Sequence, residues 1–336
     1  MKASRLLVAA LRDPTSVVPL DTADWTALLT AARAERLLGT LAVRLDRRAV
    51  PPSVARILAD ARAGAAEERR AALWEAEMAR RALAPLAIPV VLLKGTAFVA
   101  AGLAAGQGRA IGDLDILVPR DALGDAEAAL RAAGWEWVKE NAYDDSYYRR
   151  WMHELPPLIH RERDRMIDVH HTILPPTARP TPDAAALLAD AVPLGNGLAI
   201  LSDVDIIVHA AAHLFADGDL SGGLRNLWDI DRLIREFDTA DFWPRLRARA
   251  ERHQLRPEVS RAVRLVRTLY GTPVPAGWGG SLSDRLYVRR LLARDGWGRQ
   301  GYPFTRLGFF IRSHWLRMPP LMLARHLLIK AMRKPA

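Results

Sequence analysis

The stretch I-G-D-L-D-I-L-V, residues 111–118, alternates apolar with acidic positions. This period of two predicts a β-strand on which Asp113 and Asp115 share one face while the aliphatic residues fill the other. Further along, M-I-D-V at residues 166–169 repeats the apolar–acid–apolar form, and we expect Asp168 on an adjacent strand beside the pair. Like charges held this close repel one another unless a cation joins them. The pattern therefore predicts a cation site at one edge of a sheet.

Three carboxylates on adjacent strands favour a particular kind of cation. Mg²⁺ is a hard ion that prefers oxygen ligands. Three acids can hold two such ions, an arrangement that clamps an in-line phosphoryl or nucleotidyl transfer, and Mn²⁺ is the alternative ion for the same ligands. Any one Asp alone is more typical of a turn. It is the combination of Asp113, Asp115 and Asp168 that predicts a metal site.

A second candidate feature precedes the acids at residues 88–96, I-P-V-V-L-L-K-G-T. The apolar run predicts a buried strand, and the A-F-V-A-A-G-L-A-A that follows it predicts a helix. Gly95 would allow close backbone approach, Thr96 would cap the helix or bond a phosphate oxygen, and Lys94 would add positive charge. These residues predict a phosphate cradle, although a glycine at such a turn is also typical of plain turn geometry.

Taken in order, these motifs resemble a known family. A strand, a glycine with a small residue, a helix, Asp-apolar-Asp and a lone later acid are similar to the nucleotidyltransferases of the DNA polymerase β-like superfamily. Within it, L-L-K-G followed by R-A-I-G-D-L-D-I-L-V resembles the bacterial uncharacterised nucleotidyltransferase family, in which Lys-Gly and an Arg before the first Asp recur. Here those residues are Lys94, Gly95 and Arg109. The segment at 201–215 and the helix L-R-N-L-W-D-I-D-R-L-I resemble the family's helical half, so the resemblance covers residues 88–236.

The resemblance implies an α+β fold, in which a polymerase β-like core of mixed sheet and helices is flanked by N- and C-terminal helical regions. It implies an enzyme that transfers a nucleoside monophosphate from an NTP to an unidentified hydroxyl or amine acceptor, either a small molecule or a peptide or protein. Asp113 and Asp115 would ligate two Mg²⁺ ions. Asp168 would complete the second ion site and accept the proton of the acceptor.

The remaining motif residues would bind the nucleotide. Gly95 and Thr96 would hold the β- and γ-phosphates, and Lys94 or Arg109 would neutralise developing charge. An equal alternative is that Arg109 pairs with Asp113 or Asp115, so that the acids do not repel one another in the absence of metal.

Two departures from the superfamily pattern occur in the same region. Gly-Thr stands where superfamily members carry Gly-Gly or Gly-Ser, and the spacing from this glycine to the first Asp is longer than usual. The competing hypothesis is a catalytically silent module of the same fold that acts in binding or as a scaffold. The complete set of three acids argues against it, because clustered carboxylates are hard to hold together without a cation.

Composition adds broad limits. The chain has 336 residues, of which 50 % are hydrophobic and 26 % charged, as in a globular protein of two or three domains. We expect a helical region at 1–85, a nucleotidyltransferase core at 86–201 and a helical domain at 202–336. The absence of cysteine excludes disulfides and zinc–thiolate sites, and G-x-S-x-G and P-loop motifs are missing. No signal peptide or membrane span is expected, which favours a cytoplasmic protein.

The positive charge lies at the C-terminal end. From Arg285 onward there are twelve Lys or Arg against one acid, so this segment accounts for the whole net charge of +10. Residues 306–336 read as a basic amphipathic segment that could attach to an anionic membrane surface or bind an acidic partner. Evidence for nucleic acid is weak. The alternative is a last helix that packs on its own domain, with arginine stems reaching along its surface.

Histidines offer two further candidates. His209 and His213 lie four residues apart, a spacing typical of metal ligands, but a buried hydrogen-bonded pair explains them equally well. His170 would share the face of Asp168 and could touch the acceptor or a phosphate, although a solvated strand end is the simpler interpretation.

Overall fold

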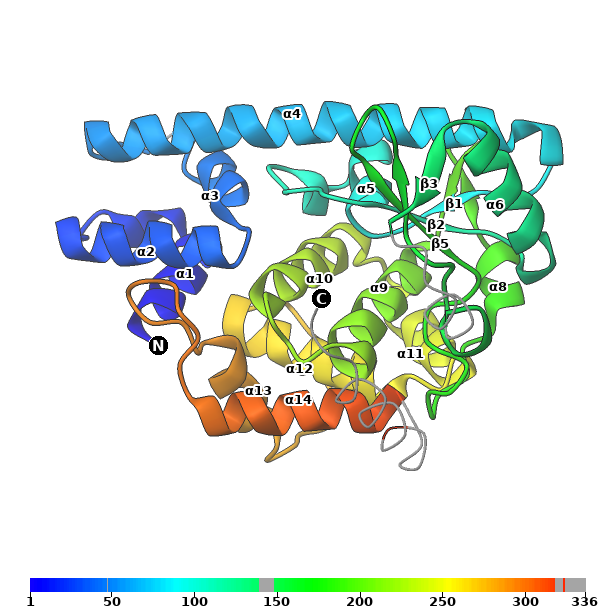
Figure 1. The fold of residues 1–336 in the computed structure, drawn as a ribbon. Helices are drawn as coiled ribbons and strands as arrows, with labels where there is room; N and C mark the ends of the chain where they lie inside the picture. The colour runs from blue at the N-terminus through cyan, green and yellow to red at the C-terminus, as the bar shows by residue number, and fades with distance from the viewer. Residues whose placement is uncertain (47, 139–147, 318–322, 324–336) are drawn as a thin grey trace.

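The computed structural model describes residues 1–46, 48–138, 148–317 and 323. It shows a mixed sheet with helices before and after it in the chain (Figure 1). The predicted α+β class with flanking helical regions is therefore confirmed. One hydrophobic core joins residues from all three expected regions, for example Leu28, Ile116 and Leu227. The division into three domains stays a prediction.

The seven strands of the sheet have the order β3-β4-β5-β2-β1-β7-β6. β2 pairs with β5 and β1 with β7 in parallel, and the other neighbours are antiparallel. In the β2–β5 pair, Asp115 lies opposite Asp168. Since residues opposite one another in register face the same side, this pairing brings the acids together. The strands are β1 (Val91–Leu92), β2 (Leu114–Leu117), β3 (Trp135–Trp137), β4 (Leu158–His160), β5 (Met166–His170), β6 (Val192–Pro193) and β7 (Ala199–Ile200).

The helices that precede and interrupt the sheet include one long helix that crosses the molecule beside it (Figure 1). This is α4, which has 32 residues and begins with Pro52, where a proline costs no intrahelical hydrogen bond. It packs against α5, α6 and β2 and so covers one side of the central strands. These helices are α1 (Lys2–Arg12), α2 (Thr22–Ala34), α3 (Leu38–Arg44), α4 (Pro52–Leu83), α5 (Lys94–Ala100), α6 (Leu123–Ala132) and α8 (Ala184–Ala189).

The helices after the sheet form a second layer in which α9 packs against α10, α11 and α12. Ser202 caps α9 by accepting from the backbone N–H of Asp205. Asp205 is fully buried and pairs with Arg249 of α11, which fixes the start of α9 to that helix. The elements of this layer are α9 (Asp203–Ala212), the π-helical turn η5 (His213–Asp217), α10 (Gly223–Phe237), α11 (Phe242–Arg252), α12 (Arg256–Tyr270), α13 (Asp284–Leu291) and α14 (Pro303–Arg317).

The basic C-terminal segment is described only in part. In α14, Phe309 is buried against Tyr287 of α13, and Arg312 donates to the backbone carbonyl of Phe215 at 2.7 Å. The first part of the segment therefore packs on the protein itself. Positions 318–322 and 324–336, to which the predicted membrane or partner contact also extends, lie outside the described residues, and that contact stays a prediction. Among the described helices, none has both the length and the apolar character needed to cross a bilayer.

Candidate active site

Three carboxylates meet where β2 begins beside β5. Asp113 immediately precedes β2, Asp115 lies within it, and Asp168 lies in β5. One carboxylate oxygen from each residue lies within 4.8 Å of the others. We call these residues the acid triad. Their spacing is short enough for the ligands of one divalent ion or of two adjacent ions. The structure thus brings together the three acids that the sequence singles out.

Asp115 is the buried member of the acid triad. Its Oδ1 accepts hydrogen bonds from Lys94 Nζ at 2.5 Å and from His170 Nε2 at 3.0 Å. Burial alone would raise the pKa of Asp115, but the Lys94 ammonium and the His170 ring outweigh it and hold the pKa well below its usual range. Both bonds end on Oδ1, so the carboxylate keeps Oδ2 with which to bind a cation. The expectation that His170 is a solvated strand end is wrong, because its ring is buried.

Lys94 reaches Asp115 from an unusual backbone conformation. Its φ is +49°, in the left-handed region that costs a residue with a side chain roughly 1 kcal/mol. Burial would lower the pKa of Lys94, but the Asp115 carboxylate outweighs burial and raises it to about 12. The lysine is therefore charged at any physiological pH. Strain of this kind is found where the surrounding structure requires one side-chain position.

Asp168 has a different environment. Burial, together with the nearby Asp115 carboxylate, raises its pKa to about 7. Asp113 is exposed to solvent. The acid triad thus contains a buried ionised acid, a partly buried acid that is half protonated near neutral pH, and an exposed acid. A divalent cation among them would remove the repulsion that opposes ionisation of Asp168.

Gly95 packs directly against the guanidinium of Arg109. A Cβ atom on Gly95 would lie 1.9 Å from Nη1 of Arg109, closer than any side chain can come. Arg109 is buried, donates from Nε to Oδ2 of Asp229 in α10 at 3.0 Å, and lies with its guanidinium carbon 5.4 Å from the ring centre of Phe98. The hypothesis that Arg109 pairs with Asp113 or Asp115 is thereby corrected. The carboxylate comes from the helical layer instead.

Thr96 does not cap the helix that follows β1. The N-cap of α5 is Leu93, and Thr96 lies inside the helix. Its side chain is buried, and Oγ1 has no hydrogen-bond partner among the described residues. The predicted capping role is therefore wrong. The phosphate contacts expected of Gly95 and Thr96 stay predictions.

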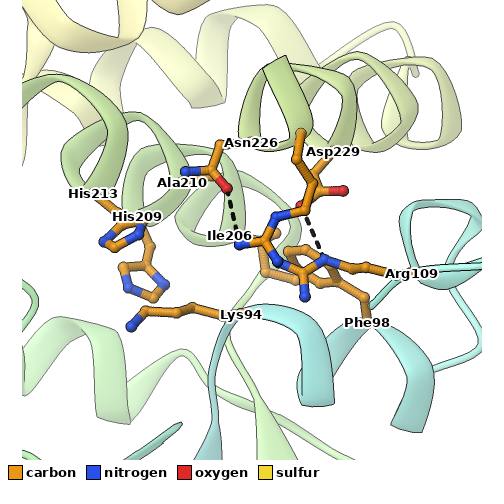
Figure 2. A pocket seen from close by; sticks show the side chains of 10 residues that line it. Lys94, Phe98, Arg109, Ile206, His209, Ala210, His213, Asn226 and Asp229 are labelled. Carbon is orange, nitrogen blue, oxygen red and sulfur yellow. Dashed lines mark hydrogen bonds and ion pairs between the residues drawn. The ribbon is translucent and has the colours of Figure 1, made fainter. Parts of the chain in front are cut away.

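A pocket lies between α5 and the helices α9 and α10 (Figure 2). About 390 Å³ of space, which includes open solvent at the mouth, lies among its lining residues. Figure 2 shows Lys94 beside His209 and His213, with Arg109 and its partner Asp229 at the other side. Since Lys94 also contacts Asp115, the pocket adjoins the acid triad through a shared lysine. The polar lining consists of Lys94, Arg109, His209, His213, Arg225, Asn226 and Asp229.

Arg225 of α10 is the most weakly partnered cation of this lining. It donates to the carbonyl of Ala110 at 3.4 Å and to Oδ1 of Asn226 at 3.5 Å, both long for hydrogen bonds. Burial, together with the nearby Arg109, lowers its pKa to about 10. A guanidinium with such weak contacts gains from an anion placed beside it. The pocket is therefore suited to an anionic ligand.

His209 and His213 belong to this pocket. Two groups of described residues could hold a metal ion, the acid triad and the group His153, Glu154 and His170, and neither contains His209 or His213. Burial and the Lys94 charge lower the pKa of His209 to about 3 and that of His213 well below its usual value. Both rings are neutral at pH 7 and can accept or donate a hydrogen bond without adding charge.

The sequence did not identify several of these residues as candidates. Arg225 and Asp229 stand four apart in a segment noted only for its resemblance, and a signal was available there: charged residues at helical spacing beside apolar ones. His153 and Glu154 gave no signal, because they precede a strand by an irregular loop.

Comparison with known proteins agrees with this geometry. No curated protein matches the chain. A family model described as "uncharacterised nucleotidyltransferase" matches residues 21–271, three quarters of the chain, including the acid triad and the whole pocket. Membership of such a family implies transferase activity with an NTP as substrate. The chain therefore belongs to the uncharacterised nucleotidyltransferase family.

Proposed function

We propose that the protein is a Mg²⁺-dependent nucleotidyltransferase, which moves a nucleoside monophosphate from an NTP to a hydroxyl or amine acceptor. The observation that carries this proposal is the acid triad, with ligand oxygens within 4.8 Å of one another, beside a pocket lined by Lys94, Arg109 and Arg225. Acids for metal ions and cations for phosphates are the two sets of groups that in-line transfer requires.

The donor set fits hard divalent ions. All three ligands are carboxylates, and Asp168 carries a raised pKa that a neighbouring cation would reverse. Asp113, Asp115 and Asp168 would hold two Mg²⁺ ions, with Mn²⁺ as a substitute. When bound, such ions neutralise phosphate charge and favour deprotonation of the attacking group. His170 and Lys94 keep Asp115 in place for this role through their hydrogen bonds to Oδ1.

The chain's own residues would then bind and orient the substrates. Lys94 and Arg225 would contact phosphate oxygens from the pocket side, because both are cations on its lining. Arg109, held by Asp229, would add positive charge behind them. Asp168, which completes the second ion site, would also accept the proton that the acceptor's hydroxyl or amine releases when it attacks the α-phosphate.

The test compares two aspartates that differ in position alone. Purified protein is incubated with Mg²⁺ and each NTP in turn, and pyrophosphate release and thermal stability are measured. Wild-type protein should melt at a higher temperature with Mg²⁺ and one NTP, by mass action on the folded state. Asp113→Asn should lose this shift and about 10³-fold or more of the turnover.

Asp121→Asn, at another exposed acid, serves as the matched control and should behave as wild type. A stabilising NTP without pyrophosphate release in the presence of varied hydroxyl and amine acceptors would support the alternative of a silent binding module. Turnover that survives in Asp113→Asn would refute the metal assignment.

A further inference from the structure

A second cluster of potential metal ligands adjoins the acid triad, because His170 contacts Asp115. His170, at the end of β5, forms a bridge with Glu154, and His153 lies next to it. Oε2 of Glu154 is 3.4 Å from His170 Nδ1 and 3.8 Å from His153 Nε2. One ligand atom from each of the three residues lies within 4.8 Å of the others. The chemistry differs from that of the acid triad, because two of the three groups are imidazoles.

The 3.4 Å between Glu154 and His170 is the separation of two ligands of a single ion, and the 3.8 Å to His153 is slightly longer. Ligand atoms at about 2.0–2.2 Å from a tetrahedral zinc are roughly 3.3–3.6 Å apart. The side chains of His153 and His170 are only 11 % and 2 % exposed. Nδ1 of each ring is buried and has no hydrogen-bond partner among the described residues. Burial also lowers the pKa of His153 well below its usual value, so this ring is neutral and has a lone pair to donate.

The hydrogen bond of His170 also supports a metal ion in this cluster. Nε2 of the ring lies 3.0 Å from Asp115 Oδ1 and donates its proton there, since an ionised carboxylate can only accept. Nδ1, the other ring nitrogen, faces the Glu154 carboxylate at 3.4 Å and can bind a metal ion when it carries no proton. A lone pair facing a carboxylate is repulsive unless a cation lies between them. A carboxylate, a histidine and a metal in line are the common way in which proteins orient metal-bound imidazole.

We infer that His153, Glu154 and His170 form a second metal site, which takes a borderline transition-metal ion such as Zn²⁺ rather than Mg²⁺. His170 binds the ion through Nδ1 and keeps its Nε2 proton on Asp115. The ion fixes the orientation of His170 and thereby that of Asp115. Two imidazoles and one carboxylate are a ligand set that proteins use for zinc. This inference stands apart from the proposed function, because metal can bind here whether or not the triad is catalytic.

The competing explanation needs no metal. A doubly protonated His170 would donate to Asp115 from Nε2 and face Glu154 with an N–H at Nδ1, forming an ion pair with both carboxylates. The two explanations differ in metal content, so a binding measurement separates them.

The experiment uses the full-length protein, first freed of metal with a chelator and then kept in excess Mg²⁺ so that the acid triad is saturated with the hard ion. Zn²⁺ is titrated by calorimetry, and the zinc retained after desalting is measured by mass spectrometry. We expect one equivalent of Zn²⁺ per chain. Co²⁺ in its place should give a visible absorption band, which reports ligands bound to the metal without any assay of activity.

Substitutions assign the ion to its ligands. His153→Gln and Glu154→Gln should each weaken zinc binding by at least about 10-fold and abolish the cobalt band. His314→Gln, which makes the same change on α14, is the matched control and should bind as wild type. Asp113→Asn should also retain zinc, even though it removes a ligand of the acid triad. Circular dichroism checks that each variant is folded, and Glu154→Asp, at a partly exposed position, provides a milder change if the histidine variant does not fold.

Three outcomes would overturn the inference. Wild-type protein that retains no zinc would favour the protonated His170. Zinc that is lost in Asp113→Asn but kept in His153→Gln would be bound at the acid triad. Equal zinc binding by wild type, Glu154→Gln and His153→Gln would place the ion elsewhere. If turnover fails while zinc binds as expected, the proposed function is wrong and the second site remains.

Discussion

The two sides of the candidate site are built in opposite ways. On the sheet side, like charges from β2 and β5 are held together by strand register, and Asp113 is separated from Asp115 by a single residue. On the helical side, Arg109 and Asp229 are 120 positions apart and are joined only when α10 packs beside the loop before β2. The comparison teaches that the acids are positioned by local pattern and the cations by tertiary packing. Substitutions on the two sides should therefore differ in how strongly they lower turnover and how strongly they lower stability.

The largest loss of turnover is expected within the acid triad, where a buried and an exposed aspartate can be compared directly. Asp115→Asn and Asp113→Asn should both lower turnover by about 10³-fold or more. Only Asp115→Asn should also destabilise the fold, by roughly 2–4 kcal/mol, because it removes the carboxylate that accepts from Lys94 and His170. Urea unfolding of both variants provides the measurement. Equal stability of the two would mean that Asp115 is held by packing rather than by its charge.

On the helical side, the expected loss is in stability. Asp229→Asn leaves the buried Arg109 guanidinium without its carboxylate and should cost about 3–5 kcal/mol of unfolding free energy. The matched control is Asp203→Asn, since Asp203 pairs with Arg245 at the surface and its loss should cost at most about 1 kcal/mol. Chemical denaturation of the two variants would reveal the difference. If Asp229→Asn loses less than about 1 kcal/mol of unfolding free energy, the proposed difference between the two sides is wrong.

A pH-dependent effect is expected at Asp168. Its pKa is raised from 3.8 to about 7, so the folded state holds a proton that the unfolded state has lost at intermediate pH. Without metal, ionisation of Asp168 lowers the free energy of unfolding as the pH rises from about 4 to 7. Above pH 7 the whole loss, roughly 2–4 kcal/mol, is present. Asp168→Asn avoids this cost. In chelator, the variant should therefore melt above wild type at pH 8, with a smaller difference at pH 5.

Mg²⁺ provides the internal control for that experiment. It should raise the melting temperature of wild-type protein at pH 8 and have little effect on Asp168→Asn, because the ion needs the ionised carboxylate. A variant that melts below wild type at pH 8 in chelator would show that Asp168 is not destabilised by its neighbours.

The smallest effect is expected at Arg225. Arg225→Gln removes a pocket cation whose present hydrogen bonds are long, so the fold should lose little stability. If the guanidinium contacts phosphate, KM for the NTP should rise about 10–100-fold, with a smaller change in kcat. Arg245→Gln, at an exposed ion pair, is the control. An unchanged KM would remove Arg225 from the nucleotide site and leave the pocket to the acceptor.

The sequence alone determined the acid triad. Apolar and acidic residues in strict alternation fix the facing of Asp113 and Asp115, and the repeat of the same pattern at Asp168 is enough to predict a neighbouring strand. Such local patterns survive without knowledge of the fold because strand periodicity is a property of consecutive residues.

Only the tertiary structure decided the partners. Arg109 was expected either to neutralise phosphate charge or to pair with Asp113 or Asp115. It pairs with Asp229, while Lys94 and His170 hydrogen-bond Asp115. His170 looked like a solvated strand end and is buried between Asp115 and Glu154. The physical reason is that a long charged side chain can reach several carboxylates, and which of them it meets depends on how distant elements pack. Contacts between residues 55 to 120 positions apart leave no period in the sequence from which to read them.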